Sequence, residues 1–130
     1  MMKLVLRNIY NNIEELSNLD LQYKVWIKAE IPNYVSSYIE LINRFDDNDY
    51  EGFITKDIKE FDLKEEFIHK LVEVHTLLEN YNGIDKTHLE IINDQAWRAI
   101  SDVAKEVKAL WEDSVLYERM AKLDENNMLS

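Results

Sequence analysis

The stretch DQAWRAISDVAKEVKALWEDSV, residues 94–115, decides the fold class. Its large apolar side chains recur at steps of three and four residues, which places them on one face of a helix: Trp97, Ile100, Val103, Ala104, Val107, Trp111 and Val115. Asn93 or Asp94 can cap this helix at its start. Beyond the stripe the pattern slips, because Glu118 and Lys122 rotate onto the apolar face. We expect the helix to change neighbours or fray there.

A second amphipathic helix is predicted upstream, over residues 63–81. Its apolar stripe consists of Leu63, Phe67, Leu71, Val74, Leu78 and Tyr81. Asp62 and Glu65 have the spacing of a capping box at its start. Asn82 followed by Gly83 is a typical stop signal for a helix.

The rest of the chain also favours helices, because it contains only one proline and two glycines. Thr87 with Glu90 can cap a short helix between the two long ones. In the N-terminal third, residues 9–19 and 21–30 are predicted to be two helical pieces, with Asp20 as a cap between them and Pro32 after the second.

A further helix is predicted to begin at Ser36 or Ser37 and to run to Phe45, with Tyr38, Leu41 and Ile42 on its apolar side. Residues 1–6, MMKLVL, are compatible with a short strand as well as with a helix. We therefore predict an all-α protein, a compact bundle of five or six helices in a single domain spanning residues 1–130.

Composition bounds the environment of the protein. Cysteine is absent, which suits a reducing compartment. No apolar run approaches the roughly 20 residues of a membrane span, and the N-terminus lacks the pattern of a secretory signal. We expect a soluble, cytoplasmic protein that does not bind membranes.

The charge is negative and unevenly distributed. The formal net charge is −11, which argues against a nucleic-acid binder. Residues 1–44 are neutral overall, with five basic and five acidic side chains. Residues 45–66 carry nine acidic and three basic side chains, a net charge of −6. Four of these acids crowd into six positions: Asp46, Asp47, Asp49 and Glu51.

The acidic segment partly matches a calcium-binding EF-hand loop. Starting at Asp47, acids stand at positions 1, 3 and 5, and Gly52 at position 6. Position 12, where the motif needs a bidentate glutamate, is Ile58. We interpret the segment as a solvated acidic turn that joins the third and fourth helices, with Gly52 supplying an unusual backbone angle.

Other metal and catalytic motifs are weak. Glu66 and His69 form one Glu-x-x-His pair, as in di-metal bundles, but both lie on the polar face of their helix, and no second pair occurs. His75 sits at the edge of the apolar stripe, and His88 lies in a predicted turn. No cysteine, Gly-x-Ser-x-Gly or glycine-rich phosphate loop is present. We predict no metal site, no cofactor and no catalytic residue.

The three tryptophans divide into two groups. Trp97 and Trp111 lie on the apolar stripe, so packing in the core is a better interpretation than a ligand cage. Trp26 stands beside Tyr23 and Lys24 and is a candidate for an exposed anchor that contacts a protein partner.

Two stretches carry a resemblance to a known group: VWIKAEIPNYVSSYIELINRFDDNDYEGFI, residues 25–54, and EIINDQAWRAISDVAKEVKALWED, residues 90–113. Together they cover about half of the chain. The Trp-Ile before a proline, the acidic Phe-Asp-Asp-x-Asp segment and the late Asp-x-x-Trp-x-x-Ile are similar to small immunity proteins of bacterial contact-dependent growth inhibition and related polymorphic toxin systems. The resemblance implies a cytosolic, non-enzymatic protein that binds and blocks a cognate toxin domain.

Charge and composition, rather than the resemblance, nominate the residues that would contact the partner: Asp46, Asp47, Asp49, Glu51 and Trp26. An acidic surface steers basic partners and can occupy the phosphate sites of a nuclease. Two other classes stay open at this point. One is a metal-binding or carboxylate enzyme of the helical-bundle type, and the other is an acidic phage or accessory structural protein.

Overall fold

The computed structural model describes residues 2–31 and 36–129, and the side chains of residues 5–31 and 36–122. All regular structure in these residues is helical, which confirms the prediction of an all-α bundle. The elements are α1 (Met2–Leu16), α2 (Leu19–Gln22), the π-helix η1 (Tyr23–Ile27), α3 (Tyr38–Asp47), α4 (Tyr50–Thr55), the 3-10 helix η2 (Asp57–Glu60), α5 (Glu65–Asn80), α6 (His88–Asn93), α7 (Gln95–Glu112) and α8 (Val115–Leu129). There are more helices than expected because several connections form short helices of their own.

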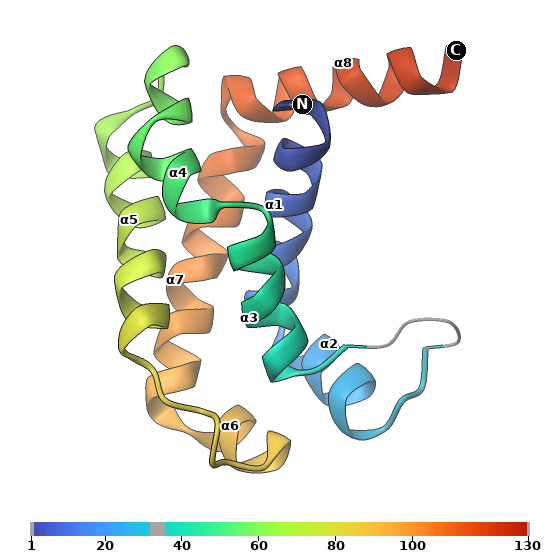
Figure 1. Ribbon diagram of the computed structural model, residues 1–130, viewed down its shortest axis with the longest axis vertical. Helices are drawn as coiled ribbons and strands as arrows, with labels where there is room; N and C mark the ends of the chain where they lie inside the picture. The colour runs from blue at the N-terminus through green and yellow to red at the C-terminus, as the bar shows by residue number, and fades with distance from the viewer. Residues whose placement is uncertain (1, 32–35, 130) are drawn as a thin grey trace.

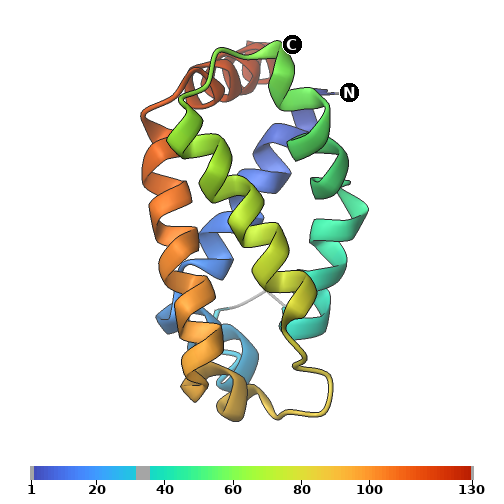
Figure 2. The same cartoon turned by 90° about the vertical axis from the view of Figure 1, so that its left-hand side faces the viewer.

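The helix α7 is the centre of the bundle. It packs most extensively on α5 and on α1, and α1 in turn packs on α3. Figure 1 shows these four helices running roughly alongside one another, with α8 crossing one end and α2 and α6 closing the other. Turned by 90°, the view in Figure 2 shows α5 crossing in front of the bundle, with α7 on one side and α3 on the other. The helix α4 joins α3 to α5 across one end.

Two fully buried tryptophans on α7 organise the core. The ring of Trp111 contacts the rings of Tyr10, Phe53 and Phe67, from α1, α4 and α5. Trp97, four turns away, contacts the rings of Trp26, Tyr38 and Tyr81, and its Nε1 donates a hydrogen bond to the buried Oε1 of Gln22. Each indole thus joins three separate elements to α7, which confirms the prediction that both belong to the core.

The start of α5 differs from the prediction. The helix begins at Glu65, and its N-cap is Lys64, which makes no capping hydrogen bond through its side chain. Asp62 lies two residues before that cap, so the capping box of Asp62 and Glu65 is wrong. Glu65 and Glu66 instead place two negative charges in the first turn, where the helix dipole favours them.

The end of α5 also differs. The helix stops at Asn80, and Gly83 does not adopt a positive φ, so the glycine is not a left-handed helix cap. Packing requires it instead, because a Cβ at Gly83 would lie 2.7 Å from Cζ of Tyr38 and 2.9 Å from Cε2 of Tyr81. The Gly83 N–H also donates a hydrogen bond to the Tyr38 hydroxyl. This contact ties the connection after α5 to the start of α3.

Several predicted caps are confirmed. Thr87 and Glu90 form a reciprocal capping box on α6, Asp94 accepts a bond from Ala96 N at the start of α7, and Ser37 caps α3. The cap of α2 is Asn18 rather than Asp20. The predicted stop at Pro32 lies outside the described residues.

The slip in the apolar pattern after α7 marks a helix boundary. The helix ends at Glu112, and Ser114 accepts a hydrogen bond from Leu116 N at the start of the next helix. Val115, expected on the α7 stripe, instead begins α8 and is 42% exposed. Among the α8 side chains that the structure describes, residues 115–122, Leu116 and Met120 are buried in the core. None of the helices described here is long and apolar enough to span a bilayer.

Candidate partner-binding groove

The acidic segment is mostly helical rather than a loop. Asp46 and Asp47 form the last turn of α3, Asp49 is the N-cap of α4, and Glu51 lies in the first turn of α4. Only Asn48 and Asp49 separate the two helices. The prediction of an acidic turn is therefore wrong about its length, because most of the segment is helical. All four carboxylates are nevertheless exposed to solvent, as predicted.

The unusual backbone angle belongs to Asp49 and not to Gly52. Asp49 has φ 50° and ψ 54°, in the left-handed region, and its Oδ1 accepts a hydrogen bond from Gly52 N at 3.1 Å. Gly52 has no positive φ. A Cβ at Gly52 would stand 2.1 Å from Oδ2 of Asp49, so glycine leaves room for the capping carboxylate. Asp49 thus caps α4 and also contributes a negative charge to the surface.

The calcium register is incompatible with this backbone. Its twelve positions from Asp47 to Ile58 pass through all of α4 and into η2, where an EF-hand requires one continuous loop. Glu66 and His69 are both exposed, and His69 Nε2 lies 3.7 Å from Oε1 of Glu65. Within the described ranges, no group of three or more histidine, aspartate or glutamate side chains could hold a metal ion.

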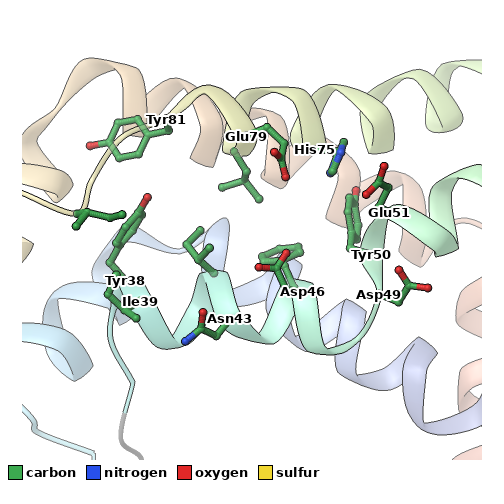
Figure 3. A pocket seen from close by; sticks show the side chains of 14 residues that line it. Tyr38, Ile39, Asn43, Asp46, Asp49, Tyr50, Glu51, His75, Glu79 and Tyr81 are labelled. Atoms are coloured by element: carbon green, nitrogen blue, oxygen red, sulfur yellow. The ribbon is translucent and has the colours of Figure 1, made fainter.

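A groove lies where α3 faces α5, closed at one end by α4 (Figure 3). Its volume is about 490 Å³, and we call it the α3–α5 groove. It is lined by Tyr38, Ile39, Ile42, Asn43, Phe45 and Asp46 of α3, by Asp49, Tyr50 and Glu51 at the start of α4, by His75, Leu78 and Glu79 of α5, and by Tyr81 and Ile84 after α5. Three of the four predicted acids line it, whereas Asp47 does not.

The charge of the groove is entirely negative. Asp46, Asp49, Glu51 and Glu79 line it, and no lysine or arginine does. None of these four carboxylates forms an ion pair with a described side chain. Some acids on other faces form ion pairs, such as Asp20 with Lys24, Glu106 with Lys70 and Glu112 with Lys108, whereas others, such as Glu60 and Asp113, form none with a described side chain. The groove therefore concentrates uncompensated negative charge.

The opposite end of the groove is apolar and aromatic. Figure 3 shows Tyr38, Ile39 and Tyr81 at this end, with Asp49 and Glu51 at the other. Ile39 is 47% exposed and Ile84 is 74% exposed. The groove thus has an apolar end and an acidic end.

The tyrosines of the groove stay neutral at physiological pH. Burial raises the pKa of Tyr38, partly opposed by the hydrogen bond from Gly83 N. Burial likewise raises the pKa of Tyr81, as does the hydrogen bond that its hydroxyl donates to Asp94. The fully buried Tyr50, whose pKa is also raised by burial, donates to the Leu71 carbonyl at 2.6 Å. The negative charge of the groove therefore comes from its carboxylates alone.

Trp26 is not an exposed anchor. Its side chain is 7% exposed and packs against the rings of Trp97 and His88, and the His88 Nδ1 lies 3.2 Å from the Trp26 carbonyl oxygen. Burial removes it from any surface that could meet a partner. The π-helix η1 holds it in place, with Lys28 N bonded to the Tyr23 carbonyl five residues earlier.

Trp26 belongs instead to a buried polar network around Glu15, which the sequence did not indicate. Glu15 is 2% exposed. Its Oε2 accepts hydrogen bonds from Trp26 Nε1 at 3.1 Å and Ser36 Oγ at 2.6 Å, and Arg44 Nη2 lies 3.3 Å from both of its carboxylate oxygens. The network joins α1, η1, the segment before α3 and α3 itself. It thereby fixes the helix that forms one wall of the groove.

The neighbouring position shows why this burial was missed. Glu14 is exposed and reaches Lys108, whereas Glu15 faces inward with Leu16 and Asn12. Two adjacent glutamates look alike in the sequence. The only available signal was the helical position of Glu15, beside the buried stripe of Ile9, Ile13 and Leu16.

No protein-family model, no curated protein and no solved structure matches this chain.

Proposed function

We propose that this protein is a non-enzymatic inhibitor that binds a protein partner with a basic surface, in the manner of a bacterial immunity protein that neutralises a cognate toxin domain. The observation that carries the proposal is the α3–α5 groove, in which four carboxylates form no ion pair with a described side chain and no lysine or arginine belongs to the lining. Unpaired like charges repel one another in the free protein. A cationic partner would relieve that repulsion.

Electrostatics gives the proposal a mechanism. A concentrated negative face accelerates encounter with a positively charged partner, and the gain depends on ionic strength. Enzymes that act on nucleic acids present positive grooves to the phosphate backbone. A carboxylate-lined surface seated on such a groove occupies the phosphate positions and excludes the substrate. A nuclease domain is therefore the target class that the charge favours.

The exposure of the carboxylates favours binding over catalysis. A catalytic acid of the carboxylate type needs an apolar pocket that raises its pKa. Asp46, Asp49, Glu51 and Glu79 are all exposed to solvent. Such carboxylates are suited to meeting charges on another molecule, and we place the protein in the cytoplasm, where a toxin delivered into the cell would act.

The proposal predicts that a neighbouring gene encodes a large protein with a variable C-terminal domain, and that domain is the one to test. Expression of that domain alone should arrest growth, and co-expression of this protein should restore it. Purified together, the two should form a stoichiometric complex whose formation abolishes the activity of the domain. A domain that stays fully active in the presence of excess folded inhibitor would overturn the assignment.

Paired charge reversals locate the surface. Asp46→Lys with Glu79→Lys changes two groove charges, and Glu60→Lys with Asp113→Lys changes two exposed acids outside the groove lining. Both variants move the net charge from −11 to −7, because each of the two reversals adds two units. Growth protection should fail with the first variant and persist with the second.

A further inference from the structure

We infer that the α3–α5 groove receives a short, cationic, amphipathic helix of the partner, with apolar residues at one end and arginine or lysine at the other. The inference deepens the proposed function and rests on it. It specifies the chemistry of the element that the groove recognises.

The two ends of the groove determine where the occupant is apolar and where it is cationic. Ile39 and Ile84 offer exposed apolar surface at the end where Tyr38 and Tyr81 line the groove, and exposed apolar side chains are stabilised when a partner removes them from water. Asp46 and Glu79 stand on the two facing helices, and Glu51 lies in the first turn of α4 (Figure 3). A complementary segment places its apolar side chains at the tyrosines and its cations between the two carboxylate-bearing walls.

The walls favour a helix over an extended segment. Both α3 and α5 satisfy their backbone groups internally, so they offer no row of donors and acceptors to an extended peptide. A helix brings its own backbone hydrogen bonds and needs only side-chain contacts. This is the helix-in-groove mode of recognition, with anchors at positions i, i+3 or i+4, and i+7.

The length of the wall sets the length of the occupant. The ten residues of α3 extend about 15 Å at 1.5 Å per residue, which corresponds to about three turns of a partner helix. One turn can then face the apolar end and the next two the carboxylates. Arginine suits these positions because its planar guanidinium binds a carboxylate through two hydrogen bonds.

Synthetic probes test the inference without the natural partner. The first is a 14-residue, alanine-rich peptide with leucines in one terminal turn and arginines on the same face of the next two turns, made in both orders. Two matched peptides replace arginine with glutamate or leucine with serine. Binding is followed by NMR of the isoleucine methyl groups and by fluorescence anisotropy, with the wild type and the two double charge reversals described above.

We expect the arginine–leucine peptide to shift the methyl signals of Ile39, Ile42 and Ile84, and to become helical on binding. The glutamate peptide should not bind, and the serine peptide should bind about tenfold more weakly. Asp46→Lys with Glu79→Lys should weaken binding about tenfold or more, while Glu60→Lys with Asp113→Lys should stay within about threefold. Both variants should retain the far-ultraviolet circular dichroism of the wild type.

Three results would overturn the inference: methyl shifts confined to other faces, equal losses in the two double variants, or spermine competing as strongly as the peptide. The last would show a site for small polycations. Failure of the proposed function is separate from these. A groove that binds the peptide in a protein that inhibits no toxin domain refutes the inhibitor assignment. Inhibition that survives the groove reversal refutes the groove as the binding surface, and with it the occupant, but leaves the inhibitor assignment standing.

Discussion

Replacement of Glu15 by alanine should destabilise the protein by about 3 kcal/mol. The side chain is 2% exposed and accepts hydrogen bonds from Trp26 and Ser36, both of which are buried. Each buried donor left without an acceptor costs about 1–3 kcal/mol. The Arg44 side chain is 37% exposed and keeps some access to water. Loss of its carboxylate partner therefore adds less to the destabilisation than it would for a fully buried arginine.

The neighbouring Glu14 provides a matched control. It sits 4.0 Å from Lys108 and its side chain is 48% exposed, so Glu14→Ala should cost under about 0.5 kcal/mol. Urea unfolding followed by circular dichroism measures both variants. With a slope of about 2 kcal/mol per molar, Glu15→Ala should lower the midpoint by about 1.5 M with little change in slope. Equal midpoints for the two variants would refute the assignment of Glu15 as a buried structural acceptor.

Two further predictions concern residues with a left-handed backbone, and a third concerns the pH dependence of stability. Asp49→Asn should change the free energy of unfolding by less than about 0.5 kcal/mol, because asparagine can still cap α4 and tolerates the left-handed backbone. Asp49→Lys loses both properties and should lower the free energy of unfolding by about 1–2 kcal/mol. Equal costs for the two variants in urea unfolding would contradict this. Ala29 has φ 51°, so Ala29→Gly should raise stability by about 0.5 kcal/mol, and a loss would show that the strain is absent. Hydrogen bonds from the Lys86 ammonium, the Tyr81 hydroxyl and the backbone N–H of Ala96 lower the pKa of Asp94. The stabilisation from this carboxylate is therefore complete above its ordinary pKa of about 4 and is lost as pH falls through the lowered value. Asp94→Asn should therefore flatten the acid limb of a stability–pH curve, and an unchanged limb would exclude the linkage.

The parts of the fold that follow from local pattern were predictable. The α7 stripe placed Trp97 and Trp111 in the core, and the spacing of Thr87 and Glu90 gave the cap of α6, because helical periodicity and capping depend on residues a few positions apart. The start and end of α5 were less accurate. Gly83, for example, is set by its contact with Tyr38, 45 residues away, and not by the turn geometry that glycine usually signals.

The candidate site was only half visible in the sequence. The clustering of Asp46, Asp49 and Glu51 marked one side of the groove, but Glu79 joins them only because α5 folds back opposite α3. Trp26 was misjudged for the same reason. Trp26 is buried because it contacts Glu15 of α1 and Trp97 of α7. The sequence around Trp26 does not reveal that these two helices pack against it.

The central claim is that the α3–α5 groove recognises a basic partner through its four exposed carboxylates. Asp46 and Glu79 lie in the last turns of their helices, where lysine suits the helix dipole, so their reversal should maintain or raise the melting temperature. Loss of binding in this variant would then not come from unfolding.

The most direct measurement is the association rate of the cognate toxin domain across a range of salt concentrations, for wild type and both double charge reversals. Asp46→Lys with Glu79→Lys should associate about tenfold more slowly at low salt and show a flatter salt dependence, while Glu60→Lys with Asp113→Lys should follow the wild type closely. Identical rates and salt slopes for the two variants would contradict the assignment of the groove as the recognition surface.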